Sequence, residues 1–486
     1  MHKTVTLLGI TALLGLSPSA VMAQTETEVP AVEAVQETPE SPAPVAAPVA
    51  PAAPVVPQPS PVEAYNQGVA AFQAGNLEAA LSYFNAAIAA NPQYVEAYVY
   101  RGAIYSRQQD WSNAMINLDR AIELDPTNAN AYFMRGVTYY GMGNREAASQ
   151  DFTTAVEQDP SSVSAYLYRG LIDAEGTNTN LAIEDFTEAI NRDPQAVDAY
   201  VLRGFAYEKS GAYEEAVADF SQAIQLDGGR AVAYMGRGVA YYNLEMLTPA
   251  LDDLNQAVSL NPNLARAYLN RSYIYVRQNR PNRALADLDR AIELDPKLSE
   301  AYLNRGIVRA SEGEYQAAER DFARSLELNP SQAQAYKQKG DVQMSIGDEL
   351  GAIADYSEAL FIDVSYAEAY KARGDARLAI GDTLGAISDY TQAVTVQPGY
   401  LEAYAARGNA YIQMGNSQSA YIDLTQVITS DPRNISPVVY YNRGMAQANM
   451  GEILGARRDL EQAASLYLET GNAAGYRATL QALGQL

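Results

Sequence analysis

The chain has 486 residues, with 58 acidic against 34 basic residues and a formal net charge of −24. This length is roughly three times that of a typical single domain, which argues against one compact core. The excess of acid disfavours nucleic acid and anionic membranes as partners, because phosphate binding needs clustered Lys and Arg. Cysteine is absent and His2 is the single histidine, so disulfides, thiolate metal sites and a thiol nucleophile are excluded.

The first segment, residues 1–23, has the pattern of a secretory signal peptide. Lys3 precedes a mostly apolar run over residues 5–16, and Val21-Met22-Ala23 places small or apolar residues before a cut after Ala23. We therefore expect a periplasmic or secreted protein with no direct membrane insertion after cleavage. The alternative is an uncleaved N-terminal anchor.

Residues 24–60 differ in composition from the rest of the chain. They contain nine prolines and five glutamates, with no Lys, Arg or aromatic residue. Proline fixes φ and removes a backbone donor, and the segment has little apolar area to offset the entropy of ordering. The composition predicts a disordered linker rich in Pro, Ala and Glu.

From residue 61 the sequence repeats with a period of 34 residues. One clear unit, residues 95–128, has the following residues at positions 4, 8, 11, 20, 24, 27 and 32: Tyr98, Gly102, Tyr105, Ala114, Leu118, Ala121 and Pro126. Twelve units fit, starting at residues 61, 95, 129, 163, 197, 231, 265, 299, 333, 367, 401 and about 437. Each unit holds two apolar stripes with helical spacing, separated by a short polar break, which predicts two amphipathic helices.

This pattern resembles the tetratricopeptide-repeat family over most of the chain. The resemblance implies an all-α fold, a right-handed superhelical solenoid of antiparallel helix hairpins over residues 61–471. Position 20 is alanine in every unit, and position 8 is glycine in all but one, where Ser272 stands. Small residues there allow the paired helices to approach closely. Residues 472–486 are expected to form a C-terminal capping helix.

A charge pair recurs at positions 7 and 23 of the units. Position 7 is arginine in ten units, for example Arg169 and Arg203, and position 23 is aspartate in ten, for example Asp185 and Asp219. We interpret the pair as an ion pair within each hairpin; the alternative is a ladder of ligand-binding arginines. Tyrosines at positions 4 and 11 are expected to belong to the core.

The family resemblance also implies which side chains face a binding groove. In such proteins the first helices line the concave face, and positions 2, 5, 9, 12 and 13 point into it. Here these positions give a predicted apolar partner-binding groove of thirteen residues: Phe133, Val137, Tyr140, Leu167, Leu171, Val201, Phe205, Met235, Val239, Tyr242, Leu269, Tyr273 and Val276. Exposed apolar surface marks interaction sites. The alternatives are that tight packing between repeats covers these residues or that a loop occupies the groove.

The groove is expected to become polar over residues 333–436. Lys337 and Asp341, and again Lys371 and Asp375, are four residues apart within a helix, which predicts pairs that satisfy each other. Two further features stand out. Asp173 lies in the irregular turn of the fourth unit, which is either a local metal or ligand site or a loosened turn. The sequence Gly-Asp/Glu-x-Leu-Gly-Ala recurs at residues 347–352, 381–386 and 451–456, which indicates duplication within the array.

These patterns favour a non-catalytic scaffold or adaptor that binds other proteins or peptide segments. We expect no catalytic residues, no cofactor and no metal site, since neither His nor Cys remains after cleavage and no phosphate-binding loop occurs. The alternative is an envelope assembly or polysaccharide-export factor whose groove contacts a glycan or a secretion complex. Aromatic residues accommodate sugars as well as peptides, so the sequence leaves both open.

Overall fold

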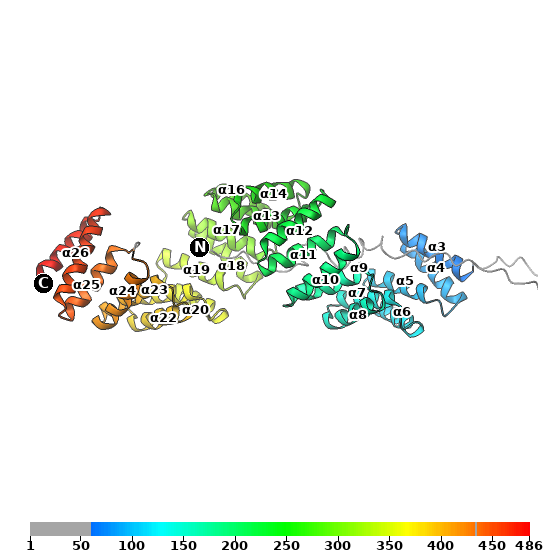
Figure 1. Cartoon of the computed structure of the whole chain (residues 1–486), viewed down its shortest axis with the longest axis horizontal. Coiled ribbons are helices and arrows are strands. Elements are labelled where there is room, and N and C mark those ends of the chain that lie inside the picture. Colours follow the sequence, from blue (N-terminus) through cyan, green and yellow to red (C-terminus); the bar gives the residue numbers. More distant parts are fainter. Residues whose placement is uncertain (1–59, 433–434) are drawn as a thin grey trace, which may run out of the picture. The chain divides into compact units, whose positions relative to one another are not determined.

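The computed structural model describes residues 60–432 and 435–486. The predicted signal peptide and nearly all of the predicted linker therefore lie outside the described residues. Within the described ranges, the chain forms an all-helical array of 25 helices, of which the first 24 pair as twelve hairpins (Figure 1). The array is a solenoid of the kind that the repeat predicts. None of the described helices is long and apolar enough to cross a membrane.

The chain divides into two units, and the first comprises residues 1–270. Its described part begins with six complete hairpins. Their helices are α3 (Pro61–Gln73), α4 (Leu77–Ala90), α5 (Val95–Arg107), α6 (Trp111–Leu124), α7 (Ala129–Gly141), α8 (Arg145–Gln158), α9 (Val163–Glu175), α10 (Thr179–Arg192), α11 (Val197–Ser210), α12 (Tyr213–Leu226), α13 (Ala231–Asn243) and α14 (Leu247–Leu260). Each odd-numbered helix is the first of its repeat and packs against the even-numbered helix that follows.

The second unit comprises residues 271–486, and α15 (Ala265–Arg277) crosses the boundary. The remaining helices continue the same alternation. They are α16 (Pro281–Leu294), α17 (Ser299–Ser311), α18 (Tyr315–Leu328), α19 (Ala333–Ile346), α20 (Glu349–Ile362), α21 (Ala367–Ala379), α22 (Thr383–Val396), α23 (Leu401–Gln413), α24 (Ser417–Ser430), α25 (Pro437–Asn449), α26 (Ile453–Glu469) and α27 (Ala473–Gln485). The last helix occupies the segment predicted to cap the array and packs on α26, with Thr479 and Ala482 buried.

Local signals end most helices at the same place in the repeat. The turn inside most hairpins contains a residue with positive φ, usually a glycine such as Gly143 (φ 83°) or Gly347 (φ 81°). After the second helix, an Asp or Asn accepts a hydrogen bond from the backbone N–H two residues ahead, as Asp125 does from Thr127 at 3.0 Å. A proline usually follows that residue and cannot continue the helix.

The core lies between the two helices of each hairpin. The alanine at position 20 is fully buried in all twelve repeats, and the large side chain at position 24 is buried beside it. Glycine at position 8 faces that side chain: a Cβ added to Gly136 would lie 2.7 Å from the Phe152 ring, and one added to Gly204 would lie 2.8 Å from the Phe220 ring. The glycine is therefore required by the large residue of the partner helix.

The sequence predicted that the tyrosines at positions 4 and 11 belong to the core, and this prediction is wrong for most of them. Of the seventeen, only Tyr166 and Tyr275 are buried. The others are half-buried, and most of them flank the arginine at position 7 on the same helix face. Arg203, for example, lies 5.8 Å from the ring centroids of both Tyr200 and Tyr207, within the range of a cation–π contact.

Candidate functional site

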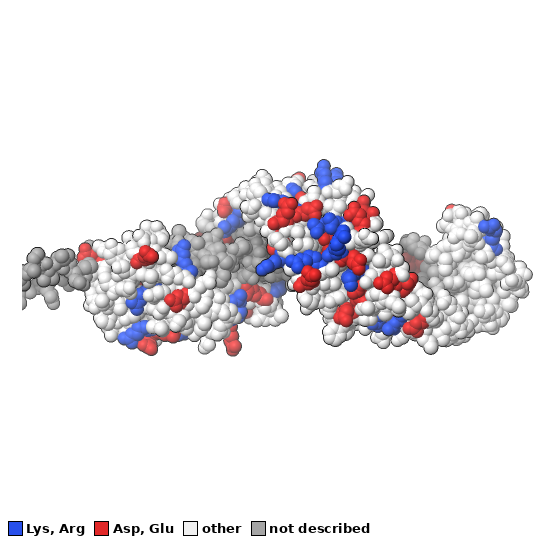
Figure 2. All heavy atoms as spheres, turned by 180° about the vertical axis from the view of Figure 1, so that it is seen from behind, with Lys and Arg blue, Asp and Glu red and all other residues white. Residues whose placement is uncertain are grey.

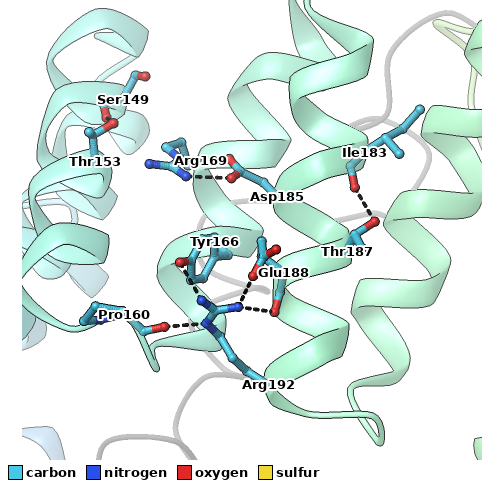
Figure 3. Close-up of polar contacts among 10 residues, drawn as sticks. All are labelled: Ser149, Thr153, Pro160, Tyr166, Arg169, Ile183, Asp185, Thr187, Glu188 and Arg192. Atoms are coloured by element: carbon cyan, nitrogen blue, oxygen red, sulfur yellow. Dashed lines mark hydrogen bonds and ion pairs between the residues drawn. The ribbon is translucent and has the colours of Figure 1, made fainter.

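The recurring Arg–Asp pair joins the two helices of the hairpin in nine of the twelve repeats, as predicted. Figure 3 shows Arg169 on α9 beside Asp185 on α10; Nε lies 2.8 Å from Oδ2 and Nη2 lies 2.6 Å from Oδ1. The same two-pronged contact recurs in eight further repeats. In the ninth repeat Lys339 takes the place of arginine and contacts Asp355 at 2.9 Å. Such fork-like pairs fix orientation as well as adding charge attraction.

The same arginines also connect neighbouring repeats. Nη1 donates to a side chain at position 25 of the preceding repeat: Arg203 to Thr187 at 3.0 Å, and Arg237 to Ser221 at 3.0 Å. Arg192 provides another connection, because it donates to the Pro160 carbonyl, the Tyr166 hydroxyl and Glu188 (Figure 3). The guanidinium groups at position 7 are thus engaged within the array, which favours the structural interpretation over a ligand-binding ladder.

The pKa shifts of the arginines follow their partners. Hydrogen bonding to Asp219 raises the pKa of Arg203, and burial opposes this effect. Arg101 in the second repeat meets Asn117 instead of an aspartate, and burial lowers its pKa. A carboxylate at position 23 therefore compensates for the burial of the arginine.

The predicted groove residues are mostly covered, so the expectation that they form an exposed apolar surface needs correction. Nine of the thirteen are buried: Phe133, Val137, Tyr140, Leu171, Val201, Phe205, Met235, Val239 and Leu269. Leu167, Tyr242 and Tyr273 are partly exposed, and Val276 is exposed. Their role in partner binding stays a prediction, and only these four offer surface to a partner.

Packing within and between repeats explains why the others are buried. The Phe133 ring lies 5.8 Å from the Phe152 ring of its own hairpin and 5.4 Å from the Tyr168 ring of the next repeat. The Phe205 ring meets Phe220 edge to face at 5.0 Å. Phe205 at position 9 thus packs within its own hairpin, whereas Phe133 at position 5 also fills the seam with the next repeat. The contact of Phe133 with Tyr168 is the tight packing between repeats that the sequence left open as an alternative.

The polar pairs of the ninth and tenth repeats are present as predicted. Lys337 Nζ lies 2.6 Å from Asp341, and the same distance separates Lys371 from Asp375. Sequence reasoning missed a third member, because the tyrosine at position 24 donates to each aspartate: Tyr356 to Asp341 at 2.9 Å, and similarly in the next repeat. The signal was available, since tyrosine at position 24 and aspartate at position 9 occur together in these two repeats alone.

The irregular turn of the fourth repeat is held from both sides. Glu175, at the end of α9, accepts hydrogen bonds from the Tyr140 hydroxyl at 2.5 Å and from Arg145 at 2.8 Å. From the following repeat, Lys209 donates to the carbonyls of residues 174 and 176 at 2.6 and 2.7 Å. A cation at the C-terminal end of a helix satisfies carbonyls that have no partner within the helix.

This turn does not bring metal-binding groups together. Burial raises the pKa of Asp173, whose side chain accepts a hydrogen bond from Asn178 at 3.4 Å. Among the described residues, no cluster of three or more His, Cys, Asp or Glu side chains could hold a metal ion. The sequence left open a ligand site or a loosened turn here, and the structure shows a turn that hydrogen bonds from both neighbouring repeats hold in place.

A buried carboxyl group was not predicted. Glu208, at position 12 of α11, is 7% exposed, and its Oε2 has no hydrogen-bond partner among the described residues. Burial raises the pKa of Glu208 to about 8. The Tyr168 hydroxyl is likewise buried without a partner, and burial raises its pKa. The sequence signal was weak, because glutamate at a first-helix position normally faces solvent.

Charges are distributed unevenly over the surface. Figure 2 shows acidic and basic side chains interspersed on one face, whereas the C-terminal end, at the right, carries few charged side chains in this view. Interspersed charges suit a surface that pairs its own ions and do not form one large field of a single sign.

Comparisons with known families give the class of protein. Models described as tetratricopeptide repeat match residues 65–129, 102–169, 197–229, 235–299, 272–340 and 401–434. The chain therefore belongs to the tetratricopeptide-repeat family. Proteins of this family are generally non-catalytic scaffolds that bind other proteins or peptides.

Solved structures of similar fold include several repeat proteins. The Cut9–Hcn1 complex of the APC/C is matched with 14% identity and a TM-score of 0.47, over 79% of this chain and 96% of that chain. YrrB, described as having an unusual peptide-binding site, gives 27% identity and a TM-score of 0.32, over 38% and 96%. PilF of Pseudomonas aeruginosa gives 23% identity and a TM-score of 0.40, over 44% of this chain and 96% of that chain. The search of curated proteins found no match.

Proposed function

We propose that the chain is a non-catalytic scaffold that holds extended or helical segments of partner proteins against the first helices of its repeats. The observation that carries this proposal is the contrast between the contacts of the position-7 arginines and the exposure of some groove residues. The position-7 guanidinium groups are engaged inside the array, while uncharged groove positions such as Leu167 and Tyr242 keep part of their surface. Uncharged, partly exposed side chains on a rigid support are suited to anchoring a partner.

Buried groove residues take no direct part in this proposal. Replacing Phe133 or Phe205 by a polar residue would disturb the seam between hairpins and so lower stability. The test must therefore use the exposed positions. Within the first unit, these are Leu167 on α9 and Tyr242 on α13.

The experiment is affinity capture from an extract of the source cells, with the full chain as bait. The double variant Leu167→Ser/Tyr242→Ser is compared with the parent. The matched control, Ile116→Ser/Leu181→Ser, changes two exposed apolar residues on second helices. We expect a partner that the parent and the control retain and the first variant loses, with all three showing the same helical circular dichroism. Equal retention by all three proteins would place binding elsewhere.

The same experiment separates the two classes of partner. Free oligosaccharide should leave retention of a protein segment unchanged. Competition by the oligosaccharide would favour the alternative, an envelope assembly or polysaccharide-export factor with a glycan in the groove.

We propose that this scaffold works in the periplasm or outside the cell, on the basis of the signal-like sequence of residues 1–23. Sequencing the N-terminus of the protein from an envelope fraction tests this. A first residue of Gln24 is expected, and a chain that retains Met1 in the cytosolic fraction contradicts it.

A further inference from the structure

Position 18 of the repeat, in the first turn of each second helix, changes character along the chain. In the first eight repeats it is polar: Glu78, Ser112, Glu146, Asn180, Glu214, Thr248, Asn282 and Gln316. In the ninth, tenth and twelfth repeats it is Leu350, Leu384 and Leu454, with exposed fractions of 70%, 69% and 80%. Scattered exposed leucines are ordinary, but three in the same register form a pattern that folding does not require.

Further apolar side chains extend this surface at the turns inside the hairpins. Ile346 and Ile380, each four residues before the leucine, are exposed at the ends of the first helices, and Met414 is exposed in the eleventh repeat. We call residues 346–350, 380–384, 414–418 and 450–454 the apolar turn edge. α20 and α22, labelled in Figure 1, begin within it.

The Gly-Asp/Glu-x-Leu-Gly-Ala sequence explains how two of the leucines are presented. Asp348 caps α20 by accepting the N–H of Gly351 at 3.0 Å, and Asp382 accepts that of Gly385 at 2.9 Å. A Cβ on either glycine would collide with the capping carboxylate. The motif therefore fixes the start of the helix and holds the leucine outward, which duplication alone does not explain.

Charge indicates which partner this edge would accept. The four turns of the edge contain no Lys or Arg and carry four acidic residues: Asp348, Glu349, Asp382 and Glu452. Arg377, on α21, approaches Asp382 only at 4.0 Å. The exposed Arg457 and Arg458 lie near the edge only at Leu454. A second copy of the chain would oppose acid with acid, and residues 24–60 carry five glutamates and no basic residue.

We propose that the apolar turn edge binds a positively charged amphipathic helix of a partner protein. Leu350 and Leu384 occupy the same position of adjacent repeats, on helices α20 and α22, which both pack against α21. A helix with apolar residues along one face presents a stripe that can contact the exposed leucines of successive repeats. Basic residues beside this stripe meet the acidic side chains.

This surface adds to the proposed scaffold function and uses none of the groove positions. The probe is a fluorescent synthetic helix with leucine on one face and lysine on the other, titrated with the full chain. Two reference peptides accompany it, one with glutamate in place of lysine and one with the same composition scrambled. The chain variants are Leu350→Ser/Leu384→Ser and the control Ile116→Ser/Leu181→Ser.

We expect the parent and the control to bind the leucine–lysine helix. The affinity of Leu350→Ser/Leu384→Ser for this helix should be lower by a factor of about ten or more. Because both leucines are exposed, its melting temperature should match that of the parent. The proposal is overturned by an unchanged affinity of this variant, by equal binding of a reference peptide, or by no binding to the parent. Leu167→Ser/Tyr242→Ser should bind the probe normally, so failure here is distinguishable from failure of the proposed function.

Discussion

At the scale of single residues, the arginine at position 7 makes three kinds of contact at once. It pairs with an aspartate of its own hairpin, bonds to the preceding repeat and lies between two tyrosine rings. Arg203 and Asp219 retain side-chain exposures of only 16% and 8%. An ion left in such a place without its partner is poorly solvated.

Arg203→Ala should therefore destabilise the chain by about 3 kcal/mol, the lower end of what losing one member of a buried pair costs. Arg203→Lys provides a matched comparison, because Lys339 holds the equivalent place in the ninth repeat. It keeps the charge pair but loses the bond to Thr187, and should cost about 1 kcal/mol. Denaturant unfolding measures both losses, and capture of the partner by folded Arg203→Ala should persist. Selective loss of binding at unchanged stability would instead support a ligand-binding ladder.

Glu208 predicts how stability depends on pH. Its pKa is raised to about 8 in the folded chain, against about 4.3 when unfolded, so the folded state holds the proton more strongly. Its contribution to stability is complete below about pH 4.3 and is lost as pH rises toward 8, by about 1.4 kcal/mol per unit. Glu208→Gln lacks this titration, so the free energy of unfolding of the variant should rise relative to that of the parent between these pH values. Above about pH 8 the difference should stay constant. A difference between the two proteins that is constant from pH 5 to pH 9 contradicts this prediction.

At the scale of the hairpin, glycine at position 8 and the large residue at position 24 form one packing unit. Adding a side chain to Gly204 forces the Phe220 ring to move, since the added Cβ would lie 2.8 Å from it. In the seventh repeat these two positions hold Ser272 and the smaller Leu288, and both residues are buried.

Gly204→Ser should cost about 1–3 kcal/mol through overpacking. Phe220→Leu, added to it, reproduces the pair of the seventh repeat and should recover part of that loss. A double-mutant cycle on thermal or denaturant unfolding gives the coupling between the two sites. If the two losses simply add, the glycine is needed for some reason other than this contact.

The hairpins themselves were predictable, and the fate of their side chains was predictable only in part. The period of 34 and the alanine at position 20 define two packed helices from sequence alone. The expected exposure of the groove residues was wrong for Phe133, because its burial depends on Tyr168 of the following repeat. How closely one repeat covers the next is a property of the stack, which a pattern read one repeat at a time does not contain.

At the scale of the whole molecule, much of the acidic charge serves the fold. Aspartates at position 23 pair with arginines at position 7, and Asp or Asn at position 31 forms the turn between most repeats. The acidic composition therefore says less about binding partners than the net charge alone suggests. Surface that the fold does not use remains at Leu167 and Tyr242 and along the apolar turn edge.

The central claim is that partner segments lie against the first helices of the repeats. Hydrogen–deuterium exchange of the full chain, with and without the retained partner, tests it most directly. The account predicts that the partner slows exchange in α9 and α13, which carry Leu167 and Tyr242, and leaves α10 and α14 unchanged. Slower exchange confined to the second helices would contradict it.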